Sequence, residues 1–213
     1  MQSNLSHPNT ASFWDRIAPK YAAKPVKDEA AYRQKLNHVE ALLGAEDRVL
    51  EIGCGTGSTA LLLAPAVAEI VATDISSGMI AVAEDKRRAA DVTNARFVQA
   101  DASETLYEAP FDAVMSFSLL HLVEDVPGVV DSVYAQLKPG GLFLSKTVCL
   151  GDASPFIRLF VWVLGAIGLA PPVTVLSKAE LCRALLRAGF DLVEHQYFGK
   201  GRMNPFIVAR RPA

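Results

Sequence analysis

The stretch Val49-Leu50-Glu51-Ile52-Gly53-Cys54-Gly55-Thr56-Gly57-Ser58 joins a short apolar run with one acid to three glycines in alternating positions. A helix-compatible segment, residues 58–63, follows at once. Glycine permits a positive φ and lacks a Cβ, so a ligand can approach the backbone closely. A helix that begins here directs free N–H groups and the positive end of its dipole at the turn. The stretch therefore predicts a buried strand that turns sharply into a helix around a nucleotide-type ligand.

Two kinds of nucleotide site are compatible with these glycines, and so is a turn that binds nothing. A dinucleotide fingerprint has the pattern Gly-x-Gly-x-x-Gly/Ala. Here the third glycine, Gly57, comes one position early, and Ser58 stands where the fingerprint ends. An acid followed by Gly-x-Gly-x-Gly resembles motif I of the class I S-adenosylmethionine (SAM)-dependent methyltransferases. The rest of the chain has to decide between these interpretations.

The composition suits one α/β domain. The chain has 213 residues, of which 51% are hydrophobic and 21% charged, so it can bury a core and is not disordered. A net charge of −2 without a polybasic tail does not favour nucleic acid as a partner. The three cysteines and four histidines show no metal-ligand spacing, so no metal is expected. Separated cysteines and a polar N-terminus without an apolar signal region favour a cytoplasmic location.

Helix and strand signals alternate along the chain. Helices are predicted over residues 10–21 (broken near Pro19), 28–43, 58–64, 77–90, 126–137 and 177–188. Strands are predicted over residues 48–52, 69–73, 95–99, 111–117, 142–148, 190–198 and 203–210. The alternation predicts a doubly wound, mostly parallel seven-stranded sheet with helices on both faces. The last two strands have only a short link, so they must form an antiparallel hairpin.

Five stretches in this order and spacing resemble the class I SAM-dependent methyltransferases. They are the glycine turn, the segments that contain Asp74, Asp101 and His121, and Leu-Lys-Pro-Gly-Gly ending at Gly141. The segment Phe-Trp-Asp-Arg-Ile-Ala-Pro-Lys-Tyr, residues 13–21, resembles the opening of the ubiquinone/menaquinone-type small-molecule methyltransferases. The resemblance covers most of the chain. It implies a single methyltransferase domain over residues 1–213, with a helical opening segment at about 10–43 and an apolar insertion at about 152–176.

The resemblance implies SAM as the cofactor and S-adenosylhomocysteine (SAH) as its product, bound at the carboxyl ends of the strands. Asp74 would accept hydrogen bonds from the ribose hydroxyls, Asp101 would accept from the adenine amino group, and Glu51 would meet the methionine ammonium. Each acid also has a structural interpretation, as a turn residue or a cap. The expected cofactor-binding residues are Glu51, Gly53, Cys54, Gly55, Gly57, Asp74, Ile75, Met79, Asp101, Ala102, Ser116, Phe117 and Tyr21.

Methyl transfer requires little acid–base chemistry, because the sulfonium is already activated and its displacement is in line. A base is needed only when the acceptor must lose a proton. Candidate bases are His121, Tyr21, His195 and Tyr197. His121 is more readily interpreted as a structural histidine that caps a turn. Tyr21 would close over the cofactor or anchor its helix on the core, so no catalytic base is assigned.

One apolar segment, residues 155–171, departs from the alternation. It has fifteen residues between its prolines and includes Arg158, whereas a membrane span needs about 20 residues. Residues 156–169 are therefore expected to form a helical cover over the acceptor pocket, with either Phe160 or Trp162 lining the pocket and the other packed on the body. The expected cover residues are Phe156, Phe160 and Trp162. Homodimerisation and attachment to a membrane surface are the alternatives.

Three classes of function are compatible with the chain. The first is methyl transfer to a small, apolar or amphipathic acceptor. The second is methylation of RNA or protein, against which stand the acidic net charge and the lack of any appended recognition domain. The third is a SAM-binding protein without transferase activity. The sequence favours the first and assigns neither the acceptor nor the methylated atom.

Overall fold

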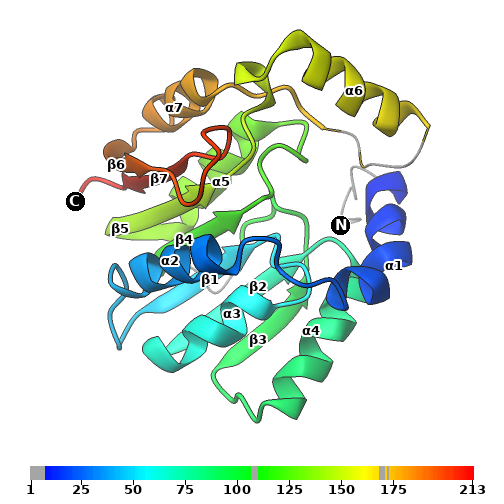
Figure 1. Cartoon of the computed structure of the whole chain (residues 1–213). Helices are drawn as coiled ribbons and strands as arrows, with labels where there is room; N and C mark the ends of the chain where they lie inside the picture. Colours follow the sequence, from blue (N-terminus) through cyan, green and yellow to red (C-terminus); the bar gives the residue numbers. More distant parts are fainter. Residues whose placement is uncertain (1–7, 107–109, 168–170, 172) are drawn as a thin grey trace.

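The computed structural model describes residues 8–106, 110–167, 171 and 173–213. Its centre is a seven-stranded sheet in the order β3-β2-β1-β4-β5-β7-β6 (Figure 1). The strands are β1 (Arg48–Ile52), β2 (Glu69–Asp74), β3 (Ala95–Gln99), β4 (Phe111–Phe117), β5 (Leu137–Lys146), β6 (Asp191–Gln196) and β7 (Phe206–Arg210).

The first five strands pair in parallel, and β7 is antiparallel to both of its neighbours, β5 and β6. The predicted mostly parallel sheet with an antiparallel C-terminal hairpin is therefore confirmed. The chain runs outward from β1 to β3 on one side and from β4 onward on the other. This reversal of strand order leaves a crevice beyond the carboxyl ends of β1 and β4, where ligands of such sheets bind.

Helices cover both faces of the sheet. They are α1 (Pro8–Ala22), α2 (Glu29–Glu40), α3 (Ser58–Leu63), α4 (Ser77–Ala89), α5 (Val126–Gln136), α6 (Pro155–Ala166) and α7 (Lys178–Arg187), with short 3-10 turns η1 (Ala64–Ala66) and η2 (Leu150–Asp152). One apolar cluster joins α2, α3 and α4 to the sheet, and a second joins α5 and α7 to the opposite face. These clusters fix the carboxyl ends of the strands at one edge.

Two predicted boundaries were wrong. The first helix continues through Pro19. A proline removes only one backbone donor, and α1 is held by its packing along α4. Residues 138–141 were expected to close the preceding helix, but they belong to β5. Gly140 N donates to Arg211 O, and Arg211 N donates to Gly141 O, each at 2.9 Å, so pairing with the distant C-terminus extends the strand.

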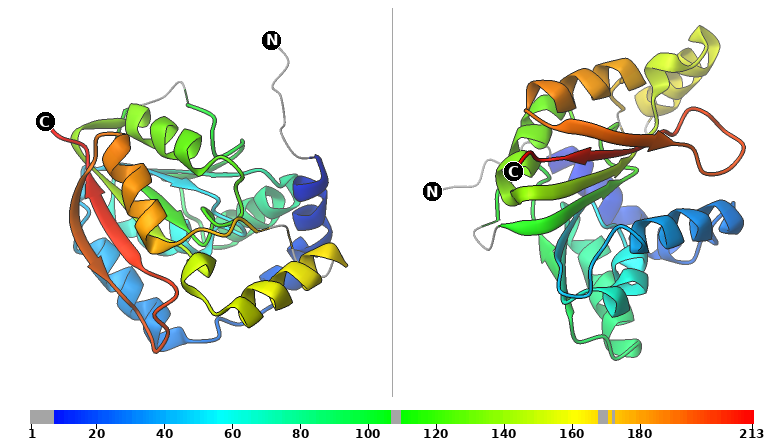
Figure 2. Two further views of the ribbon diagram at one scale, coloured as in Figure 1. Left: turned by 90° about the horizontal axis from the view of Figure 1, so that it is seen from above. Right: turned by 90° about the vertical axis from the view of Figure 1, so that its left-hand side faces the viewer.

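The apolar helix α6 projects from the body in Figure 2 and has no buried residue. Phe160 is 64% exposed and Trp162 is 68% exposed, so neither packs on the body as one of them was expected to do. Residues 168 and 169 of the predicted cover lie outside the described residues. No described helix combines the length and hydropathy that crossing a membrane requires.

Candidate functional site

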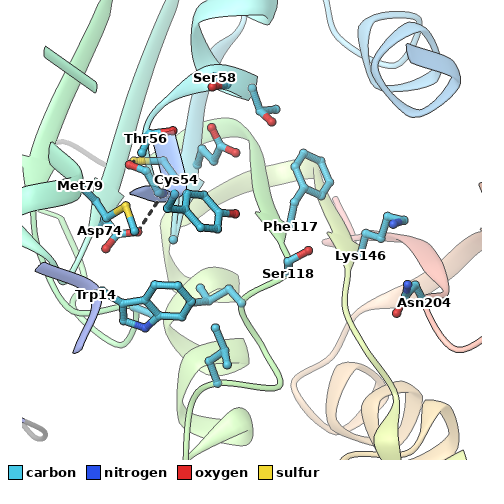
Figure 3. Close-up of a pocket in the computed structure, with 18 of the residues that line it drawn as sticks. Trp14, Cys54, Thr56, Ser58, Asp74, Met79, Phe117, Ser118, Lys146 and Asn204 are labelled. Carbon is cyan, nitrogen blue, oxygen red and sulfur yellow. Dashed lines mark hydrogen bonds between the residues drawn. The ribbon is translucent and has the colours of Figure 1, made fainter. Parts of the chain in front are cut away.

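A cavity of about 840 Å³ lies at the carboxyl edge of the sheet. Its volume is in the upper part of the range of about 300–1,000 Å³ that is usual for small-molecule sites. Figure 3 shows two groups of lining residues. Cys54, Thr56, Asp74 and Met79 form the glycine-turn side, and Phe117, Ser118, Lys146 and Asn204 form the β5 side. The cavity therefore has room for two ligands side by side.

The three glycines of the turn all have positive φ, at 69°, 55° and 73°. They differ in what surrounds them. A Cβ on Gly57 would lie 2.6 Å from the Phe97 ring and 2.8 Å from Ala83, so this glycine lets α3 pack closely and does not line the cavity. A Cβ on Gly55 would meet only Tyr21, at 3.9 Å. Gly55 is therefore the glycine whose backbone is open to a ligand.

Asp74 ends β2 and holds the glycine turn in place. Its Oδ2 accepts from Gly55 N at 2.8 Å, and its Oδ1 accepts from Ser76 N at 2.9 Å. Burial raises the pKa of this carboxyl, and the backbone donors partly oppose that shift. A carboxylate has about four lone-pair sites. Ile75 N–H is a further backbone donor to this carboxyl, and the remaining lone-pair capacity of Asp74 is open to a ligand.

Glu51, at the end of β1, is 2% exposed, and its Oε2 has no hydrogen-bond partner. Burial raises the pKa of Glu51 to about 7. The neighbouring Lys35 is also buried, and burial lowers its pKa to about 8. The Lys35 ammonium lies 3.9 Å from the centre of the Phe117 ring. The charge of Lys35 and a backbone hydrogen bond from Ala60 partly oppose the shift of the Glu51 pKa. A buried carboxylate oxygen without a donor is costly, so the free Oε2 suits a cationic ligand group.

Hydrogen bonds to the start of α4 hold helix α1 over the glycine-turn side of the cavity. Asp15 Oδ1 accepts from Ser76 Oγ at 2.6 Å and from Gly78 N at 2.8 Å, and these bonds lower the pKa of Asp15. The same helix brings Trp14 into edge contact with Tyr21, with ring centres 6.1 Å apart. Both aromatic residues line the cavity. The anchor on α4 therefore sets where α1 covers the cavity.

Most of the expected cofactor-binding residues meet in this one cavity. Asp101 is among them, and its Oδ1 is held by Ser103 N at 2.9 Å and by Ser103 Oγ at 2.6 Å. The expected residues in the lining are Tyr21, Glu51, Gly53, Cys54, Gly55, Asp74, Ile75, Met79, Asp101, Ala102 and Phe117. Gly57 and Ser116 are outside the lining, and Ser116 is fully buried.

Other candidates do not reach the cavity. His121 faces Thr147, whose Oγ1 is 3.0 Å from His121 Nδ1, and burial lowers the His121 pKa to about 4. His121 is thus neutral and held against Thr147, just after β5, and it is absent from the lining. The expected cover residues Phe156, Phe160 and Trp162 are also absent from the lining. The described residues contain no cluster of side chains that could hold a metal ion.

Many lining residues were not among the expected site residues, and four of them bear on what the cavity can bind: Trp14, Lys35, Lys146 and Asn204. Lys35 is buried next to the buried Leu36 in α2, and Lys146 ends β5 shortly after the apolar run from Leu142 to Leu144. A lysine at an apolar position is a usable signal, because burying it needs a compensating reason. Asn204, in a loop, gave no such signal.

Sequence comparison relates the chain to methyltransferases. Residues 49–141 match the family model described as "Methyltransferase domain". The demethylmenaquinone methyltransferase of Clavibacter sepedonicus is 40% identical over 99 residues, which is 46% of this chain and 39% of that protein. The ubiquinone biosynthesis O-methyltransferase of Xylella fastidiosa (strain 9a5c) is 32% identical over 194 residues, which is 86% of this chain and 75% of that protein. The chain thus spans less than half of the first relative's length and three quarters of the second's.

Solved structures show the same fold. The cyclase SpnF superposes with a TM-score of 0.76 at 19% identity, covering 95% of this chain and 94% of that one. The magnesium protoporphyrin IX methyltransferase of Synechocystis PCC 6803, solved with bound SAH, superposes with a TM-score of 0.70 at 18% identity. That match covers 95% of each chain. At these identities the likeness concerns the fold alone.

Proposed function

Since the chain belongs to the class I SAM-dependent methyltransferases, we propose that it transfers a methyl group from SAM to a small apolar or amphipathic acceptor. The observation that carries the proposal is the buried Glu51 carboxylate, whose Oε2 lacks a partner at the wall of the cavity. An amino-acid ammonium is the ligand group that such a carboxylate accepts best. The methionine part of SAM carries that group.

The residues of the glycine-turn side fit the remaining parts of SAM. Asp74 would accept from the ribose hydroxyls with the lone pairs that Gly55 N and Ser76 N leave free. Asp101 and the Ala102 N–H would hold the adenine. Gly55 would bring its open backbone against the methionine part. Bound SAM supplies a sulfonium methyl group that is already activated for displacement.

The chain's own contribution to the reaction is positioning and the exclusion of water. Trp14 and Tyr21 cover one side of the cavity, and Phe117 faces the place where the two ligands would meet. Fixing two reactants in line and excluding water can supply much of the acceleration. Tyr21 is protonated at neutral pH, because burial raises the pKa of its phenol, so it acts as a cover rather than as a base.

The domain plan is part of the proposal. The methyltransferase domain spans residues 1–213, and residues 10–43 contribute Trp14, Tyr21 and Lys35 to its site. The insertion at residues 152–176 keeps its proposed role as a cover, which requires α6 to approach the cavity when the acceptor is bound. A cytoplasmic location accords with the free thiols of Cys54, Cys149 and Cys182.

The test has two parts, binding and transfer. Calorimetry should show that SAH binds and that a nicotinamide dinucleotide does not; the reverse result would overturn the proposal. The protein is then incubated with methyl-labelled SAM and a cell extract. Label in small molecules supports the proposal, whereas label in RNA or protein supports a macromolecular acceptor. SAH binding with no labelled product favours a SAM-binding protein without transferase activity.

A further inference from the structure

The β5 side of the cavity holds a lysine without a partner. Lys146 ends β5, is half-buried and lines the cavity. Among the described residues no hydrogen bond or ion pair reaches its ammonium. Burial lowers the pKa of Lys146, and the charge of Asp28 partly opposes that shift. Another lining lysine, Lys86, donates instead to Thr56 Oγ1 at 2.9 Å and to Ser58 Oγ at 3.0 Å. The Lys146 ammonium is therefore available to a ligand in a way that the Lys86 ammonium is not.

Next to Lys146 lies a second polar group that the fold leaves unsatisfied. Asn204 Oδ1 is buried and has no hydrogen-bond partner, and Figure 3 shows this amide beside Lys146. Native structures contain few such atoms, and each calls for an explanation. Both groups line the same side of one cavity, so a single ligand can satisfy both.

Lys146 and Asn204 share the cavity lining with aromatic side chains and with exposed lysines. Phe117 stacks on Phe206 with ring centres 6.2 Å apart, and Phe198 meets Phe206 edge-on at 5.3 Å. Phe117 and Phe198 both line the cavity. Three exposed lysines also belong to the lining: Lys24, Lys27 and Lys200. Such a rim attracts anions before they bind.

The acids near this side already have partners in the fold. Asp28 caps α2 by accepting from Ala31 N at 3.0 Å, and Asp125 caps α5 by accepting from Gly128 N at 2.9 Å. Glu124 also has a partner. None of these acids lies in an ion pair with Lys146 within the described part of the chain. The Lys146 ammonium therefore remains available on the β5 side for an ion pair with a negative group of a ligand.

We propose that the β5 side of the cavity selects an acceptor with a carboxylate on an aromatic or aliphatic body. The carboxylate pairs with Lys146, a neighbouring hydroxyl or N–H donates to Asn204 Oδ1, and the apolar body rests on Phe117 and Phe198. One ammonium balances the single negative charge of one carboxylate. This inference rests on the proposed function, because it assigns the acceptor for the same cavity.

The experiment uses small carboxylic acids and their neutral amides as probes. Salicylate is paired with salicylamide and indoleacetate with indoleacetamide, and each is titrated calorimetrically into SAH-saturated protein. The wild type is expected to bind at least one acid about tenfold or more tightly than its amide. Lys146→Met should abolish this preference, and Lys146→Arg should retain most of it. Lys178→Met removes the same charge outside the lining and should leave the preference intact.

Titration of SAH into the same proteins separates this inference from the proposed function. If the wild type does not bind SAH at all, the proposed function is refuted. Normal SAH binding with no preference for either acid, or with no acid bound at all, would overturn the carboxylate inference alone. A preference that persists in Lys146→Met would overturn it as well. The methionine variant should keep the SAH affinity of the wild type, because Lys146 lies on the opposite side of the cavity (Figure 3).

Discussion

Replacing Glu51 by glutamine should stabilise the ligand-free protein and lower its affinity for SAH. In the folded chain, burial raises the pKa of Glu51 from 4.5 to about 7. Because the pKa of Glu51 is higher in the folded chain than in the unfolded chain, its contribution to folding stability is fully present below pH 4.5. That stabilisation is lost as the pH rises through 7. At pH 8 the buried carboxylate therefore costs up to about 3 kcal/mol, at roughly 1.4 kcal/mol per pKa unit.

The neighbouring Lys35 limits the gain in the free energy of unfolding that Glu51→Gln can produce. Its pKa is lowered to about 8 by burial, so the stability linked to Lys35 is present at high pH and is lost as the pH falls through 8. Glu51→Gln removes the charge that supports the Lys35 ammonium. At pH 8 Lys35 can release its proton, so we expect a gain of about 1–3 kcal/mol in the free energy of unfolding. Near pH 5 Glu51 is already protonated in the wild type, so there is no buried charge to remove and the gain should disappear.

Urea unfolding of the ligand-free protein at pH 5 and pH 8 measures the stability, and calorimetry with SAH measures the binding. Loss of a charge-assisted hydrogen bond of about 1.5–3 kcal/mol should lower the SAH affinity about tenfold to hundredfold. Glu46→Gln, at an exposed position outside the cavity, is the matched control and should change neither quantity. A Glu51→Gln protein that is less stable than the wild type at pH 8, or that binds SAH equally well, would refute the reasoning.

The remaining predictions concern the ribose-binding acid, the anchor of α1 and the apolar helix. Asp74→Ala should bind SAH about tenfold to hundredfold more weakly in calorimetry; equal affinity would remove Asp74 from the site. Asp15→Ala removes the hydrogen bonds to Ser76 and Gly78, so trypsin should cleave the segment 11–27 faster in the variant than in the wild type. Added SAH should protect the wild type from this cleavage better than it protects the variant. Unchanged cleavage would mean that α1 is held by packing alone. The double variant Phe160→Ser/Trp162→Ser should keep the thermal stability and SAH affinity of the wild type, because both rings are exposed. If α6 is the cover, the same variant should lose methyl transfer to the acceptor. Light scattering and liposome flotation complete that test: a dimeric wild type split by the change, with turnover intact, contradicts the cover.

The sheet and its glycine turn could be predicted from the sequence, because both follow from local rules. Apolar runs alternating with helices predict parallel strands, and a short link between the last two strands permits only an antiparallel pairing. Gly53 and Gly55 lie at the cavity and Asp74 ends β2 beside them, as the spacing indicated. Hydrophobic periodicity shows which face of an element is buried, so the core could be expected from it.

Contacts between groups that are distant in the sequence could not be predicted and follow from how the elements pack. Periodicity does not name a partner, and Glu51 meets Lys35 across different elements, as Asp15 meets Ser76. Gly57 has the same local pattern as Gly55, yet the contact with Phe97 gives it a packing role. The apolar content of α6 indicated burial, but nothing among the described residues covers it. Lys146 and Asn204 stand far apart in the chain and become one site only because β5 and the loop before β7 end at the same edge of the sheet.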